Sequence, residues 1–118
     1  MKRVIKATTA SHYESRFPVN HGSEKYFCYM HEDDSPFFEC ELHKVSPYDD
    51  ADYAWAKMSR NGQVVFYKSG KVVDKMQMHS YDYDEYDSYD EYVDDVLDSI
   101  VVELININKD VKPVMVHN

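Results

Sequence analysis

The sequence predicts an α+β fold, in which an antiparallel sheet of about five strands packs against one long acidic C-terminal helix, with a short N-terminal helix beside them. Between residues 25 and 79, runs rich in β-branched and aromatic residues alternate with turn-forming residues. From Tyr86 onward, apolar residues recur at steps of three and four. No long linker divides the 118 residues, so we expect a single domain spanning residues 1–118.

The first residues predict a strand and then a helix. Residues 3–7 are suited to a short strand. Ser11 is followed three residues later by Glu14, which is a capping-box pattern, and Pro18 limits the helix downstream. We therefore expect a brief helix over residues 11–17.

A hairpin is predicted next. Its two β-rich runs, residues 25–31 and 37–45, flank a segment of turn-forming residues. A turn centred between Ser35 and Pro36 would pair Cys28 with His43 and His31 with Cys40.

A three-stranded meander follows over residues 53–60, 63–68 and 71–79. Its turns are Asn61-Gly62, the strongest two-residue hairpin signal, and Ser69-Gly70. With two tight turns, Ala56 faces Tyr67 and Tyr67 faces Val72. This register gathers four apolar residues on one face as a floor for the helix: Met58, Val65, Val72 and Met76.

The long helix is expected over residues 84–108, with Lys109 near its C-terminal end and Pro113 beyond it. One side carries an apolar stripe of Tyr86, Tyr89, Val93, Val96, Leu97, Ile100, Leu104 and Ile107. The opposite side carries Asp84, Asp87, Glu91, Asp94 and Asp98. Val101, Val102 and Ile105 lie off the stripe and call for a second packing partner, either the N-terminal segment or another subunit of a homodimer. The alternative is a strand over the β-branched residues 100–106.

The net charge is concentrated in one segment. The chain has 13 Lys and Arg against 22 Asp and Glu, and nine of those acids lie between Tyr81 and Asp98 with no Lys or Arg among them. Since 22 minus 9 leaves 13, the rest of the chain is formally neutral. The net charge of -9 argues against direct binding to nucleic acid, and the hydropathy argues against a membrane protein. With no apolar leader of secretory length, we expect a cytoplasmic protein.

Two Cys-x-x-His pairs form the first candidate site. Cys28, His31, Cys40 and His43 are a ligand set that suits a structural zinc ion. Positions three apart on a strand point to opposite faces, however, so four-fold coordination needs a bulge or a twist. The alternative is that both cysteines are buried apolar residues and both histidines lie on the surface.

The acidic helix is the second candidate site. Nine charges over about 17 residues, at a rise of about 1.5 Å, give one charge per about 2.8 Å. Nucleic acid has a similar density, with one charge per about 3.4 Å on a single strand and about 1.7 Å on the duplex. Such a helix could fill an Arg- and Lys-lined groove, with tyrosines adding apolar contacts. Alternatively, the acids only solvate the surface.

Enzyme and calcium sites have weaker support. Residues 82–93 begin like an EF-hand loop but lack its glycine and its final glutamate. No catalytic motif is present, so we do not expect an enzyme; a small enzyme would be distinguished by a ligand pocket.

In its size, its single domain and its acidic segment from Asp82 to Asp98, the chain resembles the small acidic inhibitors of phages and mobile elements, the DNA-mimic and anti-CRISPR proteins. The resemblance implies a protein that occupies the basic cleft of a partner such as a Cas nuclease, so that DNA cannot enter. The residues expected to contact the partner are Asp84, Asp87, Glu91, Asp94 and Asp98, with Tyr89 and Tyr92 as anchors. The alternative function is a zinc-stabilised accessory module.

Overall fold

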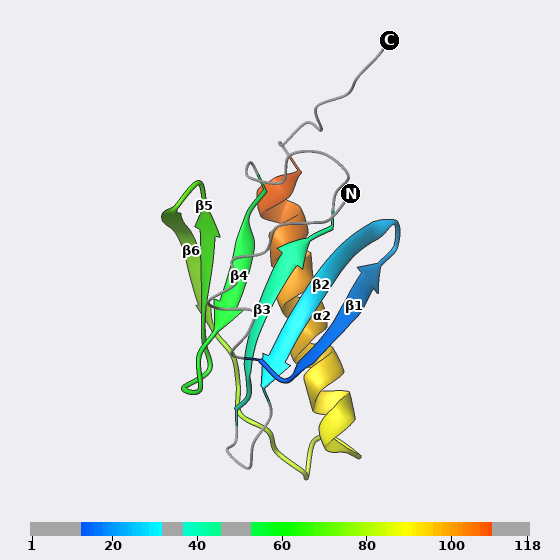
Figure 1. Ribbon diagram of the computed structural model, residues 1–118. Coiled ribbons are helices and arrows are strands. Elements are labelled where there is room, and N and C mark those ends of the chain that lie inside the picture. The colour runs from blue at the N-terminus through cyan, green and yellow to red at the C-terminus, as the bar shows by residue number, and fades with distance from the viewer. Residues whose placement is uncertain (1–12, 32–36, 46–52, 110–118) are drawn as a thin grey trace.

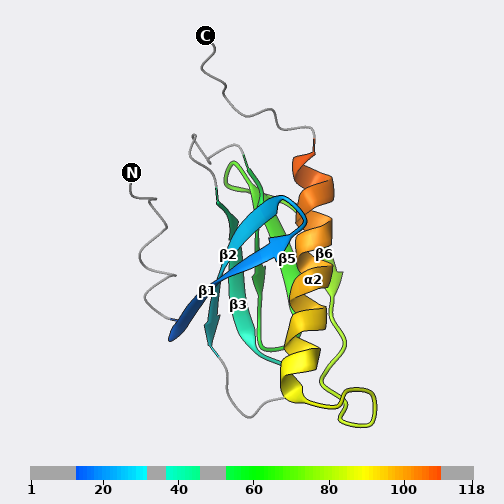
Figure 2. The same ribbon diagram turned by 90° about the vertical axis from the view of Figure 1, so that its right-hand side faces the viewer.

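The computed structural model describes residues 13–31, 37–45 and 53–109, which form one antiparallel sheet and one helix. The six strands follow one another in chain order across the sheet: β1 (Ser15–His21), β2 (Glu24–His31), β3 (Glu39–Lys44), β4 (Trp55–Met58), β5 (Gln63–Lys68) and β6 (Lys71–Gln77). The helix α2 (Tyr89–Asn108) crosses one face of this sheet (Figure 1). Seen from the side, sheet and helix form two layers (Figure 2). The predicted α+β class, with a sheet packed against one C-terminal helix, is confirmed.

The N-terminal helix predicted over residues 11–17 is wrong where the structure describes it, because Ser15–His21 is a strand. This additional strand raises the strand count from the expected five to six. Phe17 and Val19 alternate toward the core, and Gly22 turns the chain into β2 with a φ of 62°. This period of two overrides the capping-box pattern. The strand predicted over residues 3–7 lies outside the described residues.

The predicted hairpin of residues 25–45 forms, but its register is one residue off. Cys28 pairs with Leu42 and Met30 pairs with Cys40, where the sequence predicted Cys28 with His43 and His31 with Cys40. The observed register puts all four apolar residues on the face that the helix covers. A slip of one residue would turn half of them toward the other face, so the apolar pattern decides the register.

The Asn61-Gly62 turn is also one residue longer than predicted. The Gly62 N–H donates to the Ser59 carbonyl, at 2.9 Å, and Gly62 alone in this turn has a positive φ, of 83°. This is a three-residue loop with a bulge at its glycine. Ala56 therefore pairs with Phe66 rather than with Tyr67.

The Ser69-Gly70 turn has the predicted two residues, both with positive φ, and the predicted pair Tyr67 with Val72 is confirmed. An irregularity between Phe66 and Tyr67 then shifts the register along β6. The predicted floor is consequently wrong in part: Met58 is fully buried, but Val72 is 51% exposed and Val64, not Val65, faces the core.

Helix α2 begins five residues later than predicted, at Tyr89. Ser88 is the N-cap, with its hydroxyl accepting a hydrogen bond from the Glu91 N–H at 3.2 Å. The predicted apolar stripe is confirmed from Val93 to Leu104, and the alternative strand over residues 100–106 is wrong. Of the three residues off the stripe, Val101 is buried in the core, Ile105 is half-buried and Val102 is exposed.

Candidate acidic binding surface

Five carboxylates project into solvent from the first three turns of α2, and we call them the acidic face: Asp90, Glu91, Asp94, Asp95 and Asp98. Steps of four place Asp90, Asp94 and Asp98 in one row and Glu91 with Asp95 in another. The acids nearest the helix start also suit the positive end of its dipole. The acidic face is therefore held on a capped, regular helix.

Asp84 and Asp87, two of the predicted binding residues, are exposed but precede the helix. Their segment is a turn organised by Asp82, whose side chain accepts from the Asp84 N–H at 2.9 Å and whose carbonyl accepts from the Glu85 N–H at 2.9 Å. Aspartate side chains compete with the helix for backbone donors, which explains why the helix does not extend through this run. The capping pattern of Ser88 and Glu91 is the sequence signal that could have placed the start.

The acidic face is not neutralised by lysine or arginine within the described residues. Asp98 bonds the imidazole of His21 at 2.9 Å, and Asp95 accepts from the Tyr86 hydroxyl at 2.5 Å. That hydrogen bond raises the pKa of Tyr86 to about 12. The described cation pairs lie elsewhere, between Lys44 and Glu24 and between Arg60 and Glu39. The face thus keeps the negative potential that the sequence predicts.

Of the two predicted aromatic anchors, Tyr92 is fully buried and Tyr89 is half-buried. The Tyr92 hydroxyl donates to the His79 carbonyl at 2.8 Å, and burial raises the pKa of Tyr92 to about 12. Tyr92 therefore belongs to the core, and its assignment as a surface anchor is wrong. Tyr83, another of the tyrosines interleaved with the acids in the sequence, is 78% exposed in the turn before the helix.

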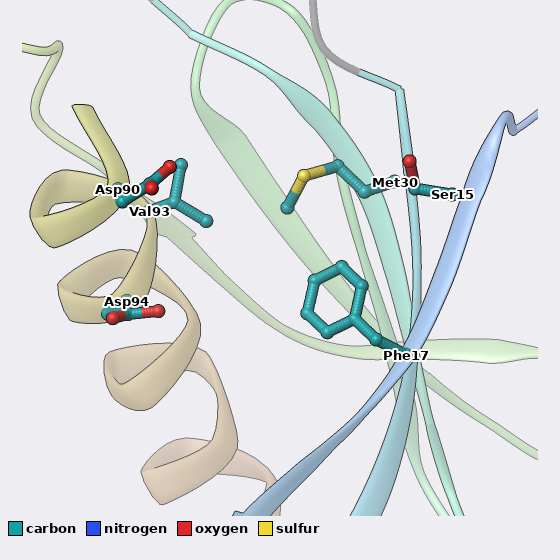
Figure 3. A pocket seen from close by; sticks show the side chains of 6 residues that line it. All are labelled: Ser15, Phe17, Met30, Asp90, Val93 and Asp94. Atoms are coloured by element: carbon teal, nitrogen blue, oxygen red, sulfur yellow. The ribbon is translucent and has the colours of Figure 1, made fainter.

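A groove runs between strand β1 and helix α2, alongside the acidic face. It consists of two adjoining hollows of about 340 and about 310 Å³ that share Phe17 and Asp94. Figure 3 shows the first hollow, with Asp90 and Asp94 on the helix side and Met30 and Phe17 on the sheet side. We call the whole the β1–α2 groove; it is lined by Ser15, Phe17, Pro18, Val19, Asn20, Met30, Asp90, Val93, Asp94, Leu97 and Asp98.

The predicted zinc ligands do not converge. Cys28 and Cys40 lie fully buried on the sheet face that α2 covers, whereas His31 and His43 belong to positions that face the other way. His43 bonds Glu41 at 2.9 Å, and His31 lies 3.3 Å from a Glu14 carboxylate oxygen. In the described part of the chain, no group of three or more His, Cys, Asp or Glu side chains is arranged to hold a metal.

The Cys28 thiol is also a poor ligand. Hydrogen bonding between Cys28 and Cys40, together with burial, raises the pKa of the Cys28 thiol well above its ordinary range. A metal-binding cysteine must be a thiolate. Cys28 therefore stays a thiol, and both cysteines are buried in the core.

Sequence reasoning missed a buried carboxylate on the other face of the sheet. Glu41 is fully buried, accepts from the Tyr13 hydroxyl at 3.3 Å and pairs with His43. His43 stacks on Trp55, which in turn stacks on Tyr67, with ring centroids 4.9 and 4.6 Å apart. Trp55 thus lies between the other two rings, and the stack links β3, β4 and β5 on this face of the sheet. The sequence signal that could have revealed this cluster is the two-residue spacing of Glu41 and His43.

Comparisons with known protein families, with curated proteins and with solved structures gave no match. The one helix of the described residues is not apolar enough along its length to cross a membrane.

Proposed function

We propose that the protein is a non-enzymatic binding protein that engages a basic, nucleic-acid-handling partner through its acidic face and the turn before it. The observation that carries the proposal is the set of five exposed carboxylates on a capped helix with no lysine or arginine partner among the described residues. Like charges held this close repel one another, so the arrangement costs stability. An oppositely charged partner would relieve that repulsion.

Charge spacing supports mimicry of a polyanion. Five charges over nine helical residues, at a rise of about 1.5 Å each, give one charge per about 2.7 Å, between the values of one DNA strand and of the duplex. Arginine grips a carboxylate and a phosphate in the same bidentate way. A cleft built for a phosphate backbone is therefore suited to this helix.

A Cas nuclease is the partner class that we put first, because the chain resembles small acidic inhibitors in size and in its acidic segment. Occupation of the cleft that receives the PAM duplex or the guide heteroduplex would exclude DNA. In this mechanism Asp87, Glu91, Asp94 and Asp98 meet basic side chains, and the exposed Tyr83 replaces Tyr92 as an aromatic anchor.

The test compares two variants with equal net charge. The first changes four acids of the surface: Asp87→Asn, Glu91→Gln, Asp94→Asn and Asp98→Asn. The control changes four acids outside the run: Asp33→Asn, Asp34→Asn, Asp49→Asn and Asp50→Asn. Binding is measured at low and high salt against purified nucleic-acid-binding proteins, Cas nucleases among them, with circular dichroism to verify folding.

We expect the control to bind like the wild type, the surface variant to lose binding, and the wild-type affinity to fall steeply with salt. Competition with the partner's DNA checks that the same cleft is used. Equal binding by the two variants, or binding by no member of the panel, would remove the proposal.

A further inference from the structure

The β1–α2 groove differs from the rest of the acidic face because it combines carboxylates with an apolar floor. Phe17, Val19 and Met30 form its sheet side, and Val93 and Leu97 form its helix side. Asp90 and Asp94 stand on its rim, as Figure 3 shows for the first hollow. A surface that only solvates the protein does not require an apolar groove beside its charges.

The carboxylates along the groove differ in whether they already have a partner within the protein. Asp98, at one end, already bonds His21 of β1, which joins the two walls there. Within the described part of the chain, the carboxylates of Asp90 and Asp94 make no side-chain hydrogen bond or ion pair. The open part of the groove is therefore the part between Ser15 and Phe17 on one wall and Asp90 and Asp94 on the other.

We propose, resting on the proposed function, that this groove docks an amphipathic basic helix of the partner, with Lys or Arg at positions i and i+4 and apolar side chains on the adjoining stripe. Asp90 and Asp94 are four residues apart, so their rise of about 6 Å equals that of i and i+4 on a second helix. The cations pair with the two carboxylates, and the apolar stripe enters the two hollows.

Strand addition at the outer edge of β1, where no other described strand pairs, is disfavoured by the same structure. β1 is the first strand of the sheet, and Pro18 lies at its middle. Proline offers no N–H to an added strand and is typical of edges that are protected from pairing. The occupant of the groove is thus more suitably a helix, which makes its contacts through side chains.

The experiment uses the full chain and a synthetic helical peptide with Lys at i and i+4 and Leu on the adjoining stripe. A second peptide of the same composition distributes Lys and Leu around the helix. We expect the patterned peptide to bind roughly tenfold more tightly or better, and to shift the NMR signals of Phe17, Val19 and Val93. Equal affinity for the two peptides, or shifts confined to the Glu91 and Asp95 side of α2, would overturn the proposal.

Two protein variants separate the groove from the charge. Ser15→Lys with His21→Lys places cations at exposed β1 positions on the side of the strand that faces α2, while Gln63→Lys with Asn106→Lys adds the same charge at exposed positions elsewhere. We expect only the first pair to abolish peptide binding. Equal peptide binding by the two doubly substituted variants would overturn the proposal that the groove is the docking site.

The peptide experiment tests the groove alone, and the proposed function is tested separately. A nucleic-acid-handling partner that binds the doubly substituted groove variant but not the variant that lacks four surface acids would support the acidic face as the binding site. The same result would contradict docking in the groove. If that partner binds the surface variant, both proposals fall.

Discussion

A single side chain, Asn108, joins the last turn of α2 to the chain that enters β4. Its carbonyl accepts from the Ala54 N–H at 2.7 Å, and its amide donates to the Tyr26 hydroxyl at 3.3 Å. Both contacts are buried, so the loss of the side chain would leave a backbone donor without a partner in the core.

We therefore expect Asn108→Ala to lower the free energy of unfolding by about 1–3 kcal/mol. Urea denaturation followed by circular dichroism measures the loss. Asn106→Ala is the matched control, because Asn106 is an exposed asparagine of the same helical turn, and its cost should stay within about 0.5 kcal/mol. Equal costs for the two variants would show that the buried contacts do not stabilise the fold.

The thiols of Cys28 and Cys40 make a second prediction at this scale. Since both are fully buried and the pKa of Cys28 is raised, neither should react with iodoacetamide until the protein unfolds, and EDTA should leave the melting temperature unchanged. Mass spectrometry of labelled protein and thermal melts provide the measurements. Rapid native labelling, or a melt lowered by EDTA, would restore the zinc hypothesis.

At the scale of elements, the β4–β5 turn depends on Gly62. A Cβ atom at this position would come within 2.3 Å of the Phe37 ring, and its φ of +83° disfavours any other residue. Gly70 has a similar φ, of +78°, but open space around it. The two glycines share the backbone conformation and differ in packing.

Gly62→Ala should therefore destabilise the protein by clearly more than the roughly 1 kcal/mol expected for Gly70→Ala, which meets only the backbone cost. Paired thermal melts give the difference. Similar losses at both positions would mean that Phe37 moves aside freely.

The contact between Asp74 of β6 and Glu103 of α2 should depend on pH. A hydrogen bond between the carboxyl groups of Asp74 and Glu103 raises the pKa of Glu103 and lowers that of Asp74, so the pair shares one proton. The stabilisation is therefore present between the two pKa values: it is lost as the pH rises through the raised pKa of Glu103, and lost again as the pH falls through the lowered pKa of Asp74. At neutral pH two carboxylates repel.

Glu103→Gln keeps a donor for Asp74 at every pH. We expect this variant to melt above the wild type at pH 7 and to lose that advantage toward pH 4, with a gain of at most about 1 kcal/mol because the pair is partly exposed. Melting temperatures of the variant and the wild type between pH 7 and pH 4 measure this gain. A difference in melting temperature that stays constant with pH would contradict proton sharing.

For the molecule as a whole, the sequence predicted the fold class and most elements because these follow from local periodicity. The stripe from Val93 to Leu104 and the turn at Ser69-Gly70 are examples. What failed depends on distant parts of the chain. The register of Cys28 is decided by burial against α2, and Gly62 of the longer turn lies close to the Phe37 ring, and no short window contains either contact.

The candidate site divides in the same way. The excess of acid and its regular spacing were readable in the sequence. The burial of Tyr92 and the β1–α2 groove were not, because both depend on how the helix crosses the sheet, and the expected N-terminal helix left no strand at the place of β1. The opposite faces of Cys28 and His31 follow from a strand period of two, which the zinc hypothesis had to set aside.

The surplus charge makes a prediction for the whole molecule. On the acidic face, Asp90 with Asp94, Asp94 with Asp98, and Glu91 with Asp95 are like charges four residues apart on exposed helix, an arrangement that costs stability. Salt screens exposed charges, so adding NaCl should raise the melting temperature of the free protein by a few degrees while it weakens binding to a basic partner. The two effects have opposite signs and the same origin.

The variant that lacks Asp87, Glu91, Asp94 and Asp98 should melt higher than the wild type at low salt and respond less to NaCl, whereas the control with four changes outside the run should keep the wild-type response. Thermal melts of the three proteins over a salt series measure this. If the wild type melted lower as NaCl was added, favourable charge pairs would dominate its surface, and the acidic face could not be the uncompensated polyanion that binding to a basic cleft requires.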